Sequence, residues 1–223
     1  MNFISGSLRT EIKWSAIYSQ QMILTLDNLN AGLHVWATGK YPSDMHNAEY
    51  HDMYSARSNG ITQQWWDATV KRLAQWRAIR PMSKVVIATK GSQCLSAVAA
   101  EYAKLKSNPS TEPSIVNTDW TDVAPLFGIA SQIKQRWPPV FASKMCHFLF
   151  PKLFIVMDTQ LCDPFEYELY WRGMKDEWQR FSNKAQAMSM FTAALKPSKP
   201  VHGDYPWETK IMELSHIGWK SSR

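Results

Sequence analysis

The sequence predicts a mostly α-helical protein. Apolar residues recur at three- and four-residue spacing in most segments, whereas strand-like alternation and a glycine-rich phosphate loop are absent from the sequence. The 223 residues, 45% of them hydrophobic, are enough for one large domain or two small lobes with a core. We therefore expect residues 1–223 to form one two-lobed helical bundle with a central cleft.

The first predicted helix covers residues 7–25, where apolar side chains recur at mostly helical spacing. Residues 27–30 carry an aspartate and two asparagines, which are typical of a turn. Residues 38–60 are polar, rich in aromatic residues and methionines, and without a clean period. We expect this segment to be a long ordered loop.

The next two segments are more regular. Thr62 or Asn59 begins a helix with an apolar face, and this helix ends before Pro81. Residues 83–106 form one or two helices, with Gly91 as the expected interruption.

A polar segment at 107–113 is the predicted boundary between the two lobes. Beyond it, Asp119 or Asp122 caps a helix that runs through Ile133. Two prolines then begin a compact helix at 140–150, since proline suits the first helical turn.

The last third of the chain continues the helical pattern. Residues 153–157 are an apolar run, either a short strand or an extended connector. Residues 163–166 form a capping box that starts a helix through about Trp171. Residues 182–195 and 205–219 are also predicted helices.

Composition limits the partners and the location. The net charge of +6 and a pI of about 9.2 favour a polyanionic partner such as nucleic acid. The three cysteines, Cys94, Cys146 and Cys162, have no CxxC spacing, so neither a disulfide framework nor a cysteine zinc site is expected. No apolar run has the length of a membrane span, and no secretion signal is recognised. We expect a cytoplasmic monomer without metal or cofactor.

Lys144 and Asp158 are the candidate catalytic residues. Lys144 shares a helical face with Val140, His147 and Phe148, which gives its ammonium an apolar setting. Asp158 follows the apolar run, where a carboxylate can be held by backbone N–H groups at a turn. The alternative interpretation is a structural salt bridge, or two separate solvated charges.

Two stretches around these residues resemble the helix-hairpin-helix DNA glycosylase superfamily. Residues 156–160 read VMDTQ and are similar to the family's V-D-T-H, and residues 137–144 read WPPVFASK in place of its L-P-G-V-G-x-K hairpin. The hairpin glycines and the cysteines of an iron–sulfur centre are absent from this sequence. The resemblance covers about residues 120–172 and is nearest to the oxoguanine-type branch.

The resemblance implies a DNA glycosylase acting on double-stranded DNA. Lys144 corresponds to the nucleophile of the bifunctional members, and Asp158 corresponds to the shared acidic residue. A carboxylate stabilises the positive charge that develops on the sugar, and a neutral amine can attack the anomeric carbon. The expected substrate is an oxidised purine or a hypermodified pyrimidine of phage DNA, so the role is repair or antiviral defence.

Such an enzyme must flip the target base and hold it against aromatic faces. The chain has eleven tryptophans to draw on, and amides can read a base edge. The candidate base-pocket residues are Trp14, Trp36, Gln63, Trp65, Trp66 and His147. Most tryptophans are expected to be core residues, because Trp66 and Trp76 lie at core spacing.

Lys134, Arg136 and Lys152 flank the candidate catalytic pair and are predicted to grip the DNA backbone. Two weaker patterns in the sequence are typical of other chemistry. His46 and His51 lie among aspartates, but their spacing fits no common metal site. Residues 208–210 imitate a nuclease E-x-K sequence without its strand. A non-catalytic interaction module on the same fold is the main alternative, followed by a metal-dependent nuclease.

Overall fold

The computed structural model describes residues 22–107, 112–158 and 167–223. This part of the chain is helical and contains no strand, which confirms the mostly-α prediction. The elements are α2 (Leu26–Thr38), α3 (Asn47–Arg57), α4 (Gln63–Gln75), the 3₁₀ turn η1 (Pro81–Ser83), α5 (Lys84–Leu105), α6 (Trp120–Ile133), α7 (Pro138–Leu149), α8 (Tyr167–Arg180), α9 (Lys184–Ala194) and α10 (Trp207–Ser221).

The predicted turn at 27–30 is wrong, because these residues lie in α2. Thr25 is the N-cap of this helix, and its hydroxyl accepts a hydrogen bond from the Asn28 N–H at 3.1 Å. Asp27 occupies the first turn, where a negative charge stabilises the helix by interacting with its dipole. The polar residues that are typical of a turn therefore belong to the capped N-terminus of α2. Residues 22–25 of the first predicted helix are not helical, and residues 7–21 lie outside the described residues.

The predicted loop at 38–60 is also wrong over about half of its length, since it contains α3. The buried positions of α3 are Asn47, Tyr50, Met53 and Arg57, which follow helical spacing. Two of these four are polar, so the buried face has no continuous apolar period. Asn47 is buried because its side chain bonds the α9–α10 connection, donating to Lys199 O and accepting from the His202 N–H.

Gly91 does not interrupt the helix at 83–106, because α5 is continuous through it. A side chain at this position would overlap the indole ring of Trp66 on α4. The glycine therefore makes room for a large core side chain. Trp66 is fully buried there, and its indole N–H donates to Ala88 O at 2.8 Å.

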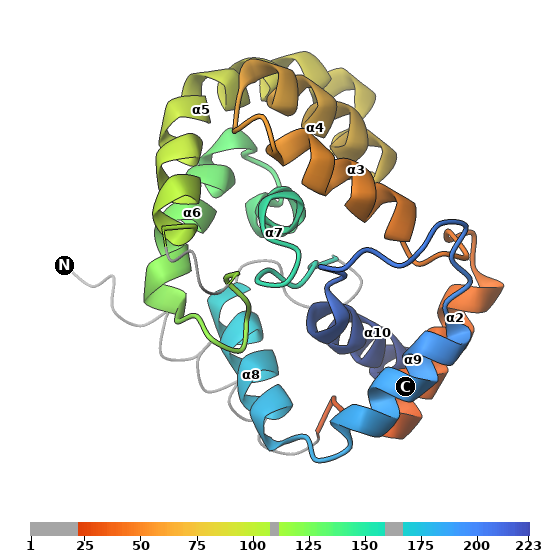
Figure 1. Cartoon of the computed structure of the whole chain (residues 1–223). Helices are drawn as coiled ribbons and strands as arrows, with labels where there is room; N and C mark the ends of the chain where they lie inside the picture. The colour runs from red at the N-terminus through yellow and green to blue at the C-terminus, as the bar shows by residue number, and fades with distance from the viewer. Residues whose placement is uncertain (1–21, 108–111, 159–166) are drawn as a thin grey trace.

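Helices α3 to α6 surround α7, which runs through the interior of this part of the molecule (Figure 1). The close helix pairs in this group are α4 with α5, α5 with α6, and α6 with α7. Helices before and after the 107–113 segment therefore pack against each other. The core is continuous and includes residues from every long helix.

A second group of helices forms around the crossing of α2 and α10, with α9 beside them (Figure 1). Gly32 on α2 and Gly218 on α10 allow this close approach. A Cβ on Gly32 would overlap Leu214 O, and a Cβ on Gly218 would overlap Asn28 O. Two helices from opposite ends of the chain are thus held almost backbone to backbone.

The remaining predictions fall near the observed boundaries. Residues 153–157 are an extended connector rather than a strand. Helices α9 and α10 confirm the predictions at 182–195 and 205–219. The capping box at 163–166 lies outside the described residues, and α8 continues past Trp171 to Arg180. Among the helices described, none has the length and hydropathy needed to cross a membrane.

Candidate functional site

Helix α7 places Lys144 in the interior. Pro138 and Pro139 begin the helix, and Trp137 before them adopts a left-handed conformation with φ 57°. Every residue from Pro139 to Leu149 is buried, because neighbouring helices and the connector that follows α7 pack around it (Figure 1). A lysine in this helix needs polar partners for its ammonium.

The ammonium of Lys144 has two such partners. It donates to the carbonyl oxygen of Trp76 at 3.1 Å and lies 3.4 Å from Oδ2 of Asp158. The Lys144 side chain is 8% exposed and the Asp158 side chain is 47% exposed. The structure therefore brings the two predicted catalytic residues together, with the lysine enclosed and the aspartate open to solvent.

Side chains rather than a sheet fix the connector that carries Asp158. The hydroxyl of Ser143 accepts from the Met157 N–H at 3.0 Å. Tyr167 and Trp171 on α8 donate to the carbonyl oxygens of Ile155 and Leu153, both at 2.8 Å. An extended segment inside a helical core satisfies its backbone groups in this way.

His147 lies one turn after Lys144 and is fully buried. Its Nδ1 is 2.6 Å from Phe154 O, and its Nε2 is 2.9 Å from the Tyr50 hydroxyl. Burial lowers the pKa of His147 to about 3, so the ring is neutral. A carbonyl oxygen only accepts, hence Nδ1 carries the proton and Nε2 accepts from Tyr50. Both ring nitrogens are occupied by structural bonds, although His147 was predicted in the base pocket.

Trp36 belongs to a row of aromatic rings that reaches the lysine site. His46 stacks on Trp76 at 4.4 Å and meets Trp36 edge-on at 5.2 Å. Tyr41 stacks on Trp36 at 4.7 Å. His46 thus connects Trp36 to Trp76, and the carbonyl oxygen of Trp76 accepts a hydrogen bond from Lys144.

A second buried lysine, Lys210 on α10, lies on this aromatic row. Its ammonium is 2.8 Å from Oε2 of Glu213 and 4.5 Å from the centre of the Trp36 ring. Burial lowers the pKa of His46 well below its usual value, and Lys210 lowers it further, followed by His147 and Lys144. The sequence prediction missed this cluster, and only the helical spacing of Lys210 and Glu213 could have indicated an ion pair.

The turn after α4 binds Lys134 as well as Lys144. Lys134 donates to Ala78 O at 2.7 Å, two residues beyond the carbonyl that binds Lys144. Burial lowers the pKa of Lys134, and the charges of Lys144, Arg80 and Arg136 lower it further. Arg80 and Arg136 form no ion pair with a carboxylate within the described ranges. Positive charge therefore accumulates without compensation beside the Lys144 site.

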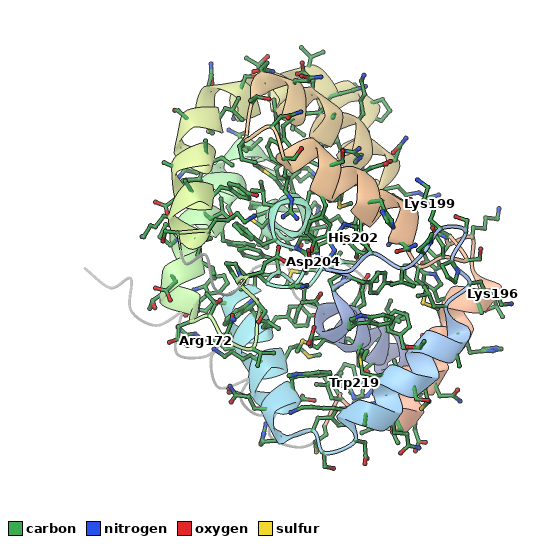
Figure 2. All side chains as sticks on the ribbon, viewed as in Figure 1. Arg172, Lys196, Lys199, His202, Asp204 and Trp219 are labelled. Carbon is green, nitrogen blue, oxygen red and sulfur yellow. The ribbon has the colours of Figure 1, made fainter. Side chains whose placement is uncertain are left out.

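Lys152, the third predicted backbone contact, has a different environment. Its ammonium is 2.7 Å from Oδ1 of Asp204 and 3.5 Å from Oε2 of Glu112. Figure 2 shows Asp204 and His202 on the α9–α10 connection where it passes α7. Lys152 is thus neutralised by two carboxylates and does not share the uncompensated charge of Lys134 and Arg136.

The other predicted base-pocket residues lie elsewhere. Trp65 and Trp66 are buried in the core on α4. Gln63 is exposed at the start of α4, and its amide donates to Asp67 at 2.8 Å. Trp14 lies outside the described residues. Among the predicted pocket residues that the structure describes, Trp36 and His147 are the two that lie in the neighbourhood of Lys144.

The candidate metal and nuclease patterns do not assemble. No group of three potential metal ligands occurs in the described part of the chain. His46 contacts Lys210, whereas the Nε2 of His51 lies 2.8 Å from Pro200 O. The E-x-K sequence is helical, within α10. Cys94 and Cys146 are free thiols, and Cys162 lies outside the described residues.

Comparisons with protein-family models, with curated proteins and with solved structures gave no match for this chain. The geometry and charge of the Lys144 site are therefore the observations that bear on function.

Proposed function

We propose that the protein is a DNA glycosylase, which flips a damaged or hypermodified base and cleaves its N-glycosidic bond to leave an abasic site. The observation that carries this proposal is the pairing of the enclosed Lys144 with the solvent-open Asp158 at 3.4 Å. An amine and a carboxylate in contact are the two groups that this reaction needs. The carboxylate is open to solvent, and the enclosed amine has to reach the sugar only if it acts as the nucleophile.

Asp158 is the charge stabiliser in this proposal. Departure of the base leaves positive charge on the deoxyribose ring, and a carboxylate nearby lowers the energy of that state. The carboxylate is half exposed, so a sugar can approach it from solvent. The bonds that Ser143, Tyr167 and Trp171 make to the connector hold its backbone in place before substrate binds.

Lys144 has one of two roles. As a nucleophile, its deprotonated amine attacks the anomeric carbon as the glycosidic bond breaks, and the base leaves with a proton taken from the nitrogen. The sugar ring then opens, so that its ring oxygen becomes a hydroxyl and the nitrogen forms an imine. As a positioning residue, it holds Asp158 while water attacks. Its bond to Trp76 O fixes the ammonium on the side of the α4–η1 turn in both cases.

DNA binding is supported by the uncompensated cations near Lys144. Lys134, Arg136 and Arg80 lie on the α6–α7 and α4–η1 turns, which form one surface next to the pair. In this proposal the boundary between the lobes is not the predicted 107–113 segment, because the helices on both sides of it pack together. Helices α3 to α7 form one lobe and α2, α9 and α10 form the other, with the Trp36–His46–Trp76 row between them. Affinity for duplex DNA is expected to fall steeply with salt, through counterion release from contacted phosphates.

A non-catalytic nucleic-acid-binding module is the second candidate. The observation that favours it is that Lys144 is fully engaged by Trp76 O and Asp158, as a structural ion pair would be. The same cations would then bind DNA without chemistry.

The deciding experiment incubates the protein with genomic DNAs that differ in base modification and measures abasic sites. The glycosylase proposal requires abasic sites in at least one modified DNA, dependent on Asp158. DNA binding without base release from any of them supports the module. Strand cleavage that EDTA abolishes would instead indicate a metal-dependent nuclease.

Borohydride trapping on a DNA from which the enzyme releases a base distinguishes the two roles of Lys144. The nucleophile role predicts a covalent protein–DNA adduct that Lys144→Gln does not form. An active wild type without an adduct assigns the attack to water. An adduct that persists in Lys144→Gln would place the nucleophile elsewhere.

A further inference from the structure

A cavity of about 360 Å³ opens where the start of α5 meets the α6–α7 turn. Its apolar walls include Met82, Val86, Ile87 and Ile133, together with the edge residue Trp137. This volume lies within the roughly 300–1,000 Å³ of typical small-molecule sites. The reaction proposed for Lys144 and Asp158 does not use this cavity.

The rim of the cavity is cationic. Arg80, Lys90, Lys134 and Arg136 contribute to its lining, and none of the acidic residues that the structure describes does. None of these four forms an ion pair with a carboxylate in the parts of the chain that the structure covers. The occupant that complements this rim is therefore an anion.

The walls, in contrast, expose apolar side chains to solvent. Met82 is fully exposed and Val86 is 56% exposed. Trp137 is 39% exposed and is held there by a left-handed backbone conformation that is rare for a bulky residue. An apolar cavity surrounded by unpaired cations fits a flat, uncharged ring system that carries phosphates at its edge.

We propose that this cavity binds one unstacked nucleotide of a DNA strand, with the base against Met82, Val86 and Trp137 and the flanking phosphates on Arg80, Lys90 and Arg136. Stacking and cationic contacts of this kind bind single nucleotides with little sequence preference. The inference rests on the proposed function only in taking DNA as the partner. It adds a site for a nucleotide other than the one at Lys144.

The cavity and the Lys144 site share one structural support. Lys134, which lines the cavity, donates to Ala78 O, and Lys144 donates to Trp76 O in the same turn. Arg80, at the end of this turn, also lines the cavity. A nucleotide seated there would lie along the same face of the protein as the base to be released, so the substrate is a duplex with local unpairing.

The test measures fluorescence-polarisation affinity for three duplexes of one sequence. The first is fully paired, the second has one unpaired adenosine, and the third has an abasic analogue at the unpaired position. The base-bearing bulge is expected to bind about tenfold more tightly than the other two, since stacking of one base supplies a difference of this size. Equal affinity for all three duplexes would overturn the proposal.

Two neighbouring variants on α5 provide the matched comparison. Val86→Trp fills the cavity, whereas Val85→Trp adds the same side chain at an exposed position that does not line it. Val86→Trp is expected to abolish the tenfold preference for the bulge over the paired duplex. Val85→Trp is expected to keep the tenfold preference. An equal loss in both variants would reject the cavity as the site.

The outcomes separate this proposal from the proposed function. A bulge preference that depends on Val86, in a protein that releases no base from any DNA, supports the cavity and rejects the glycosylase. Base release without any bulge preference does the reverse.

Discussion

Two buried lysines in this molecule differ in the exposure of their partners. Lys210 is 1% exposed and pairs at 2.8 Å with Glu213, whose side chain is only 10% exposed. Lys144 is 8% exposed and pairs at 3.4 Å with Asp158, whose side chain is 47% exposed. The first pair is closed within the α2–α10 region, while the second has one member facing solvent.

This difference separates a structural ion pair from a candidate reactive one. An enclosed pair on one helix contributes order to the core, and breaking it leaves a buried charge without compensation. A pair with an exposed carboxylate can exchange its partner for a substrate at little cost in solvation. Burial of a lysine alone therefore does not indicate catalysis. The accessibility of its counter-charge is the more informative property.

The largest expected effect breaks the closed pair. Lys210→Met leaves Glu213 buried without its cation and is expected to lower the free energy of unfolding by about 3–5 kcal/mol. Urea denaturation followed by circular dichroism measures this loss. The double variant Lys210→Met/Glu213→Leu is expected to recover most of it, because neither charge remains. A single variant as stable as wild type would show that the pair is not structural.

The next largest effect is expected from removing the exposed carboxylate. Asp158→Asn keeps the shape of the side chain but loses the charge, so base release is expected to fall by about 10²–10³-fold. DNA affinity should change little. The loss in the free energy of unfolding should be smaller than for Lys210→Met, because Asp158 is half exposed and the amide oxygen of asparagine can still accept a hydrogen bond from Lys144. Single-turnover base release and DNA binding are measured on the same substrate. Release at nearly the wild-type rate would leave Asp158 with a structural role only.

The smallest effect is a pH dependence carried by His147, which lies between the two regions. Its folded pKa of about 3 is below the unfolded value of about 6.5, so only the unfolded chain takes up the proton between these values. Its contribution is complete above pH 6.5 and is lost as the pH falls. Between pH 7 and pH 5 the loss is about 2 kcal/mol. The dependence should be weaker in His147→Gln, and identical pH profiles would contradict it.

The helical class and the Lys144–Asp158 contact could be predicted from the sequence because both depend on local pattern. Helical spacing predicts α4, α9 and α10, and the two prolines predict the start of α7. Asp158 follows a short apolar run after α7, and that connector has little length in which to move away from Lys144.

The errors arise where a tertiary contact overrides the local pattern. Gly91 is typical of a helix break, but α5 continues because Trp66 occupies the space beside it. Asn47 and Arg57 are polar residues on the buried face of α3, so its period is hidden. The cluster of Lys210, His46 and Trp36 joins residues more than 150 positions apart, which no local pattern can predict.

The close crossing of α2 and α10 through Gly32 and Gly218 has a consequence for the order of folding. Helix α2 leaves the ribosome long before α10, whereas α4 to α7 follow one another and can pack early. The apolar face of α2 therefore stays exposed until α10 has been synthesised. We expect chains truncated before α10 to aggregate through this face, and co-translational chaperones to protect it until α10 is made.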